Sequence, residues 1–256
     1  MTTRKPTLDE WFLAYQLRKM NRDLFFNPAQ LDVDVTPLVE RQQSRAARIS
    51  YPALVMKALA LTARAVPEIN RAYVRTPFGD RVVEFDHISV NLPVPVRENG
   101  HSYLTAIVVR DADRTPVTAI ADQIRAAQAR SIDDTKITKI VARRPNNLWW
   151  RTVLRGIHFA AHRWPGMERL GAGGLSVTSM LEHRDDPPIM HVTSFGPTAI
   201  TVVVSAVRRT ADGRHVMELG LGVNHVAMTG LTFRRMTTAL HDVLASRDPE
   251  HLAAFD

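Results

Sequence analysis

AITVVVSAVRRTADGRHVMELGLGVNHVAMTGLTFRRMTTALHDVLAS, residues 199–246, is the part of this chain whose pattern says most about its architecture. Residues 199–207 and 216–223 are rich in β-branched side chains, and Asp212-Gly213 between them suits a tight hairpin turn. Residues 231–246 are predicted to form a helix. The stretch therefore predicts two antiparallel strands that lead through a short turn into a helix.

The same two patterns recur toward the N-terminus. Short runs with alternating or β-branched apolar residues, bounded by turn sequences such as PFGD and ENG, predict strands at residues 29–38, 71–75, 81–85, 87–96 and 103–109. Apolar residues that recur every three or four positions predict helices at residues 7–23, 50–66, 116–131 and 148–164. Because the hairpins follow one another without regular βαβ alternation, we predict an α/β fold of two layers, a mixed and largely antiparallel sheet with helices. With no repeat and no long linker, residues 1–256 are predicted to form one domain.

Composition narrows the function classes. The chain has 256 residues and no cysteine, which excludes disulfides, thiolate metal sites and a cysteine nucleophile. No signal-peptide pattern and no membrane-spanning run is present, so we expect a cytoplasmic protein. The net charge of +7 is not arranged in a nucleic-acid-binding pattern, so we expect no nucleic acid partner and favour small anionic molecules such as coenzyme A.

His225 is the strongest candidate for chemistry. It follows a predicted strand and precedes the short sequence VAMTG, a setting that can hold an exposed general base rigidly. The glycines of GLGVNH lie inside a strand and lack the third glycine of a dinucleotide motif. His158 and His162 have the spacing of two metal ligands but share their helix with arginines, so we read them as a solvated polar face and expect no metal site.

Several segments of the chain resemble the catalytic domain of the acyltransferase subunit of 2-oxo acid dehydrogenase complexes, which shares its fold with chloramphenicol acetyltransferase. DVDVTPLVERQQ is similar to the family's first core strand, and SYPALVMKALALTARAVPEIN to its helix ending in VPELN. ISVNLPVPV and VVRDADRTPVTAIADQIRAAQARS are similar to the strand and helix that follow. The resemblance covers most of the chain and implies a chloramphenicol-acetyltransferase-like fold.

Two motifs in this resemblance carry chemistry. GGLSVTSM resembles the family's GTFTISNL and places Thr178 where the family has the serine that donates to the tetrahedral oxyanion. NHVAMTG resembles DHRVVDG and places His225 on the family's general base. The resemblance implies acyl transfer from a thioester such as an acyl-CoA, which acts as a co-substrate, with no tightly bound cofactor.

The second motif also departs from the family. The family's aspartate of the DG pair is Thr229 here, and the aspartate before the histidine is Asn224. In the family that first aspartate pairs with an arginine of the N-terminal helix, whose place Arg18 takes in QLRKMNRD. We therefore expect a buried Arg18 without a carboxylate, hydrogen-bonded to backbone carbonyls near Thr229 or turned toward another acid. The supporting residues implied by the resemblance are Arg18, Ser179, Asn224, Thr229 and Gly230.

The sequence thus predicts a stand-alone CoA-dependent acyltransferase, without a lipoyl or subunit-binding domain, that acts on a small apolar metabolite or lipid. The alternative is a non-catalytic pseudoenzyme or assembly scaffold of the same fold. The resemblance implies a homotrimer whose sites lie between subunits. In the helix at residues 148–164, Trp149 and Trp150 beside arginines suit a substrate entrance or a membrane face, and packing on the protein's own core is the alternative.

Overall fold

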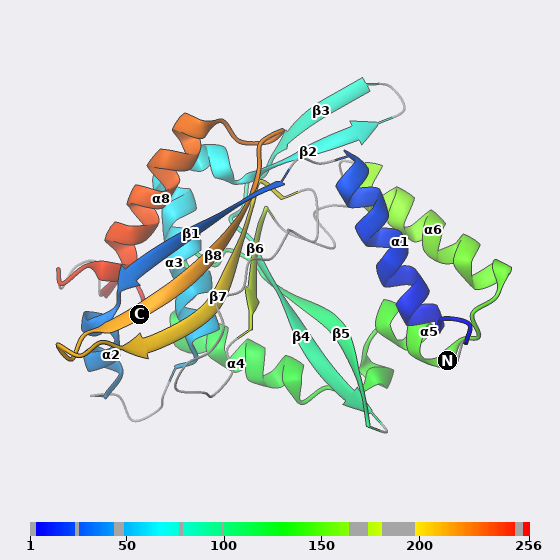
Figure 1. Ribbon diagram of the computed structural model, residues 1–256, viewed down its shortest axis with the longest axis horizontal. Helices are drawn as coiled ribbons and strands as arrows, with labels where there is room; N and C mark the ends of the chain where they lie inside the picture. Colours follow the sequence, from blue (N-terminus) through cyan, green and yellow to red (C-terminus); the bar gives the residue numbers. More distant parts are fainter. Residues whose placement is uncertain are drawn as a thin grey trace.

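A six-stranded sheet forms the centre of the computed structural model, which describes residues 4–23, 26–43, 49–76, 79–98, 100–163, 174–180, 198–248 and 253–256. The strand order is β1-β8-β7-β6-β4-β5, from left to right in Figure 1. The strands are β1 (Phe26–Asp34), β4 (Val90–Glu98), β5 (His101–Val109), β6 (Leu175–Ser179), β7 (Ile200–Arg209) and β8 (His215–Asn224). β6 runs parallel to both of its neighbours, and the other pairs are antiparallel. The predicted mixed, largely antiparallel sheet is confirmed.

The hairpin of β7 and β8 carries the candidate base at its far end. Its turn is closed by a hydrogen bond from the Thr210 amide to the Arg214 carbonyl at 2.8 Å, and Gly213 adopts a positive φ of 87° that favours glycine. From this turn the ladder runs to the pair Ile200 and Val223. Asn224, the last residue of β8, therefore lies at the end of the sheet opposite the hairpin turn.

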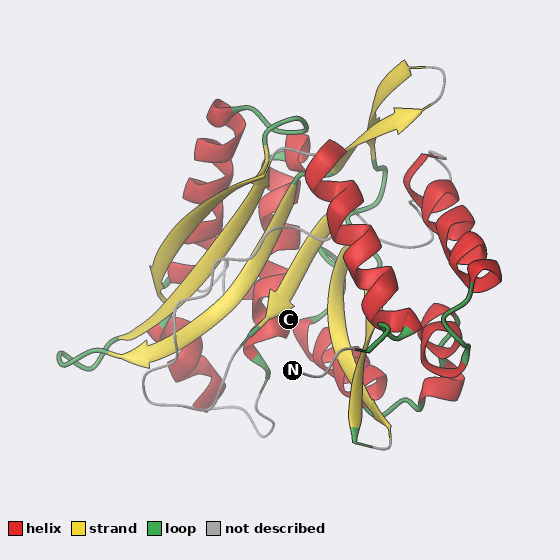
Figure 2. Ribbon diagram, turned by 45° about the vertical axis from the view of Figure 1, so that its right-hand side comes forward, coloured by secondary structure: helices red, strands yellow, loops and turns green. Residues whose placement is uncertain are grey.

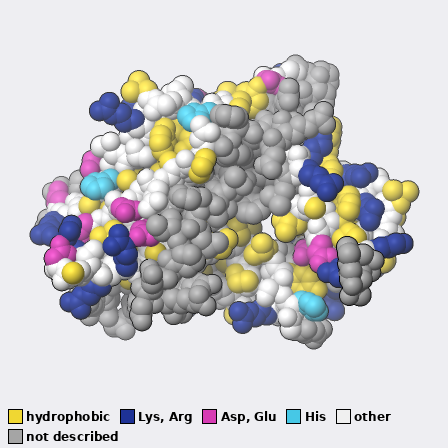
Figure 3. All heavy atoms as spheres, in the orientation of Figure 1, with side chains coloured by type: hydrophobic (Ala, Val, Ile, Leu, Met, Phe, Trp, Pro, Cys, Tyr) yellow, Lys and Arg dark blue, Asp and Glu magenta, His cyan; other side chains and the backbone are white. Residues whose placement is uncertain are grey.

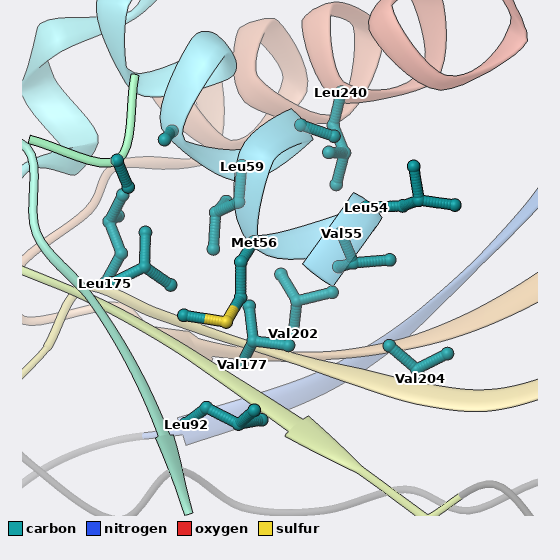
Figure 4. Close-up of a cluster of buried hydrophobic side chains, with 14 of the residues drawn as sticks. Leu54, Val55, Met56, Leu59, Leu92, Leu175, Val177, Val202, Val204 and Leu240 are labelled. Atoms are coloured by element: carbon teal, nitrogen blue, oxygen red, sulfur yellow. The ribbon is translucent and has the colours of Figure 1, made fainter. Parts of the chain in front are cut away.

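One face of the sheet packs against helices α3 (Tyr51–Ala65), α4 (Val117–Gln128) and α8 (Gly230–Ala245), as Figure 2 shows. Figure 4 shows Met56 and Leu59 of α3 above Val177 of β6 and Val202 of β7. Successive side chains of a strand point to opposite faces. The residues next to these buried valines, among them Thr178, therefore belong to the other face of the sheet.

A second, smaller group of buried apolar side chains lies outside this core. Leu8, Phe12, Val141 and Leu154 form it. They come from α1 (Leu8–Asp23), α5 (Ile137–Arg143) and α6 (Leu148–Arg163), which stand together on the right of Figure 1. We call α1, α5 and α6 the three-helix unit.

A two-stranded ribbon, β2 (Arg71–Thr76) and β3 (Gly79–Glu84), follows the 3₁₀ turn η1 (Pro67–Ile69) in the chain and contacts α6 of the three-helix unit. It forms its own antiparallel ladder, and Ala72 makes an isolated antiparallel bridge to Thr198, just before β7. The start of β2 is thereby placed close to the end of the sheet where β8 ends.

The predicted elements largely agree with the structure, with three corrections. α5 was not predicted, and α2 (Thr36–Gln43) begins inside the segment predicted as a strand. Asp34 explains the second difference, because its Oδ1 accepts hydrogen bonds from the Thr36 amide at 3.0 Å and hydroxyl at 2.6 Å and so begins a helix. His158 is not on a solvated face, because it is only 8% exposed and its ring meets that of Tyr15 edge to face.

Lys57 is a buried cation in the middle of α3. Its Nζ donates to the carbonyl oxygens of Asp113 at 2.7 Å and Thr115 at 2.9 Å, which tie α3 to the loop before α4. Burial lowers the pKa of Lys57. Among the described residues, no helix is long and apolar enough to cross a lipid bilayer.

Candidate active site

Asn224 organises the turn that presents His225. Its backbone carbonyl accepts hydrogen bonds from the amides of Ala227 at 3.0 Å and Met228 at 2.9 Å, and its Oδ1 accepts one from the Val226 amide at 3.2 Å. Its own amide donates to the Ala199 carbonyl at 3.0 Å, which fixes the turn to the start of β7. His225, between these anchored residues, is exposed. The turn therefore holds an accessible imidazole on a rigid backbone, as a general base requires.

The side-chain nitrogen of Asn224 is a donor without an acceptor in the described part of the chain. Asn224 is 0% exposed, and its Nδ2 has no hydrogen-bond partner there. A buried polar group left unpaired costs about 1–3 kcal/mol.

Thr229 begins the helix that follows the turn. It is the N-cap residue of α8, and its Oγ1 accepts a hydrogen bond from the Thr232 amide at 3.2 Å. Threonine in this position satisfies one of the free amides of the first helical turn. Gly230 is the first residue of α8 and is exposed. Thr229 thus has a structural role at the position where the resembling family has its aspartate.

Arg71 supports the same turn from outside, and the sequence analysis missed it. Its Nε donates to the Ala227 carbonyl at 2.6 Å, and its side chain is partly buried. The two residues are 156 positions apart, and the acceptor is a backbone atom, so neither spacing nor a motif connects them. The only available signal was the position of Arg71 directly after the family-like sequence VPEIN.

An ion pair lies next to this hydrogen bond. Arg235 of α8 donates from Nη1 to Oε1 of Glu68 in η1 at 2.6 Å. The pKa of Glu68 is lowered, first by a hydrogen bond from its own backbone amide, then by the bond from Arg235, with a smaller coulombic contribution from Arg71. The interactions of Glu68, Arg71 and Arg235 thus link η1, β2 and α8 around the turn of His225.

Thr178 lies on β6 and is 7% exposed, and its neighbour Ser179 is partly buried. In the ladder, Thr178 pairs with Val203, which pairs with Gly220 of β8. Asn224 lies four residues further along β8, so two strand spacings and four residue rises separate it from Thr178 by roughly 17 Å. The side chains of Thr178 and Asn224 share one face of the sheet. Because His225 follows Asn224 directly, the structure does not bring Thr178 and His225 together within one protomer.

The expectation for Arg18 is wrong in one respect. Arg18 lies on α1 and is exposed, so it is not a buried arginine that has lost its carboxylate. The hydrogen bond to a carbonyl near Thr229 that was expected of Arg18 is made by Arg71.

Other candidate sites add little. Among the described residues, no group of three or more His, Asp or Glu side chains has the arrangement to hold a metal ion. The glycines of GLGVNH lie within β8, as expected. The sequence HRDDPPIMH, residues 183–191, predicts an exposed loop and not a metal or acid cluster, and it lies outside the described part of the chain.

Comparisons with known proteins agree with this fold. No known family profile matches the chain. One curated protein, the dihydrolipoyllysine-residue acetyltransferase component 3 of the mitochondrial pyruvate dehydrogenase complex of Arabidopsis thaliana, is 35% identical over 85 residues. This match covers 33% of the chain and spans 14% of the length of that protein.

Solved structures match nearly the whole chain. The cubic core of a pyruvate dehydrogenase multienzyme complex has a TM-score of 0.65 and 14% identity, with 96% of this chain and 92% of that chain covered. A probable dihydrolipoamide acetyltransferase from Listeria monocytogenes has a TM-score of 0.65 and 15% identity, with 97% of each chain covered. Chloramphenicol acetyltransferase has a TM-score of 0.52 and 14% identity, with 96% and 100% covered.

The chain therefore has the fold shared by chloramphenicol acetyltransferase and the catalytic acyltransferase cores of 2-oxo acid dehydrogenase complexes. The resemblance predicted from the sequence is confirmed at the level of the fold.

Proposed function

We propose that this protein is an acyltransferase that moves an acyl group from acyl-CoA to a hydroxyl, amine or thiol of a small apolar metabolite or lipid. The observation that carries the proposal is the exposed His225 on a turn held by Asn224 and Arg71, in a fold that acyltransferases use. A rigid, accessible imidazole is the main requirement for a general base in direct acyl transfer.

The proposed reaction has two steps. The imidazole of His225 takes the proton of the acceptor group, whose oxygen, nitrogen or sulfur attacks the thioester carbonyl carbon and places the electron pair on the carbonyl oxygen. The Thr178 hydroxyl donates to this oxyanion. When the oxyanion collapses, the carbon–sulfur bond breaks, and the thiolate of coenzyme A takes the proton from the imidazolium.

The site is proposed to form between subunits of a homotrimer. Within a protomer, Thr178 is too far from the His225 turn for both to contact one carbonyl group, whereas a neighbouring subunit can supply the second residue. One solved structure of the same fold is itself the cubic core of a multienzyme complex, which supports an assembly of subunits. The cytoplasmic location and the absence of a tightly bound cofactor stay predictions.

The test is thiol release from acetyl-CoA and longer acyl-CoAs, measured with and without hydroxylated, amine and thiol acceptors. Acceptor-dependent release of free thiol, together with the acylated acceptor in mass spectrometry, is the expected result. Absence of transfer with every donor, in protein whose fold and assembly are intact, would contradict the proposal.

A non-catalytic scaffold is the second candidate. Thr229 caps α8 in place of the family's aspartate, and Arg18 is exposed, so the pair expected in the family is absent at these two positions. A scaffold would keep the assembly and bind no acyl-CoA. Calorimetric titration with a non-hydrolysable acyl-CoA analogue separates the two functions.

A further inference from the structure

The net positive charge of the protein comes from one segment. Between Asp134 and Glu168 the sequence has seven Lys and Arg residues and no acidic residue. The rest of the chain has 26 basic and 26 acidic residues, so this segment accounts for the whole net charge of +7. α5 and α6 of the three-helix unit lie in it.

Part of this charge is neutralised within the protein. Lys139 contacts Asp133 at 3.1 Å, and Arg143 contacts Asp133 at 3.0 Å and Glu98 at 2.8 Å. These pairs account for both basic residues of α5 and leave Lys136 and the arginines on and near α6.

Arg144 and Arg155 lie over aromatic rings. Arg144 lies 4.9 Å from the ring centre of Trp150, and Arg155 lies 5.4 Å from Trp11 and 5.7 Å from Tyr15. Within the described residues, no carboxylate pairs with Arg144 or Arg155, and both are exposed. Their positive charge is therefore available to an external anion.

Exposed apolar side chains lie beside these charges. Leu148 is 76% exposed, Trp149 68% and Phe159 50%. Leu148, Arg155 and Phe159 share one outward stripe of α6, because they are spaced seven and four residues apart. The other side of α6 packs through Leu154 into the three-helix unit. Figure 3 shows apolar and basic side chains side by side at the right-hand end of the molecule.

We propose that Arg144, Leu148, Trp149, Arg155 and Phe159 form a docking surface for an anionic lipid membrane. A helix with basic residues beside Trp, Leu and Phe lies in the membrane interface, with its apolar side chains in the boundary between headgroups and acyl chains. Anionic headgroups attract the arginines, and this attraction extends over about one Debye length. This proposal goes beyond the acyl transfer and does not depend on it.

The mixture of side chains favours a membrane over nucleic acid or an acidic protein. Phosphates of a nucleic acid match the arginines, but an aliphatic side chain as exposed as Leu148 gains nothing from them. A membrane provides acyl chains for Leu148 and Phe159, and a headgroup layer that suits the amphipathic ring of Trp149.

The experiment is co-sedimentation of the full-length protein with vesicles of phosphatidylcholine alone and of phosphatidylcholine with about one third phosphatidylglycerol. Two double variants alter the surface: Leu148→Ser with Trp149→Ser, and Arg144→Glu with Arg155→Glu. The matched controls are Val82→Ser, at an exposed apolar residue of β3, and Arg81→Glu with Arg114→Glu, two exposed arginines elsewhere. Thermal unfolding checks that all variants remain folded.

We expect the protein to bind anionic vesicles, and to bind neutral vesicles at least about tenfold more weakly. Salt should weaken the binding to anionic vesicles. The arginine variant should bind more than about 25-fold more weakly, since each basic residue contributes about fivefold. The apolar variant should also bind weakly, and the controls should bind like the wild type.

Four results would overturn the proposal. The first is no binding to anionic vesicles or equal binding to both kinds, and the second is equal effects of surface and control variants. The third is a change of molar mass in light scattering of the surface variants without vesicles, which would assign this surface to contacts between copies. The fourth is tighter binding of duplex DNA than of vesicles, lost in the arginine variant, which would assign the surface to nucleic acid.

Discussion

Arg71 and Ala227, which are 156 residues apart, are joined by a hydrogen bond of 2.6 Å from the Arg71 Nε to the Ala227 carbonyl. The bond ties the β2–β3 ribbon to the turn that presents His225. In the resembling family a side-chain carboxylate in the turn meets an arginine of the N-terminal helix, whereas here an arginine of the ribbon holds the backbone of the turn. In this chain the turn of the candidate base is therefore held through its backbone.

Arg71→Ala should lower kcat at least about tenfold with little change in KM, because small displacements of a catalytic group cost up to about a hundredfold in rate. Arg71→Lys should restore part of the loss, since an ammonium group also donates to a carbonyl. Steady-state kinetics of acyl transfer measure both effects, with Arg81→Ala, in the same ribbon, as the control. Equal losses in Arg71→Ala and Arg81→Ala would contradict a specific role in positioning.

His225→Ala should reduce acyl transfer by at least about a hundredfold, because general base catalysis typically contributes that much or more. Since His225 is exposed, the melting temperature should remain close to that of the wild type. Thiol release and thermal unfolding are the two measurements. An unchanged rate would remove His225 from the mechanism.

A mixture of two inactive variants tests whether the site lies between subunits. His225→Ala and Thr178→Ala should each be impaired alone, but co-expressed subunits should form some interfaces with both residues intact. Each mixed cyclic trimer contains one restored interface out of three, so mixed assemblies purified by two different tags should show about one third of the wild-type activity. Light scattering that finds a monomer at micromolar concentration would contradict the trimer.

Thr229→Asp should preserve or raise activity, because aspartate is as good an N-cap as threonine and restores the carboxylate of the family motif. Thr229→Ala removes the bond to the Thr232 amide and should lower the free energy of unfolding by about 1 kcal/mol. Urea unfolding and acyl transfer rates of both variants provide the comparison. If Thr229→Asp abolishes transfer in an active protein, the turn does not tolerate the carboxylate.

Lys57→Met should lower the free energy of unfolding by about 1–3 kcal/mol near neutral pH, because two carbonyl oxygens lose a charged donor. The folded-state pKa of Lys57 lies below its ordinary value of 10.5, so between these two values the unfolded chain binds more protons than the folded one. The wild type should therefore gain stability relative to Lys57→Met as pH rises through this window. Urea unfolding at several pH values tests the sign, and a difference that shrinks with rising pH would contradict the burial of the ammonium group.

The sequence predicted the parts of the fold that follow from local periodicity. The β7–β8 hairpin and α8 could be predicted because alternation, an Asp-Gly turn and helical spacing each act over a few residues. α2 was missed because Asp34 both ends an alternating strand and begins a helix through its side chain, which the alternating pattern does not reveal. α5 was missed because its seven residues are too few for a clear helical period.

Motifs of the resembling family point to His225 and Thr178, and their roles stay predictions. Arg71 could not be found from a motif or from spacing, because its acceptor is a backbone carbonyl brought close by the tertiary fold. His158 was misread because Tyr15 of α1 packs edge to face against its ring and helps to bury it. Contacts between helices that are distant in sequence determine whether such a residue is buried.

The two separate groups of buried apolar side chains imply that substitutions in one group act on stability independently of substitutions in the other. Leu154 lies in the small group of the three-helix unit and Leu240 in the main core. Losses of stability from substitutions at distant sites without shared partners add, with little interaction between them. A substitution at Leu154 should therefore lower the stability of the protein without disturbing the packing around Leu240.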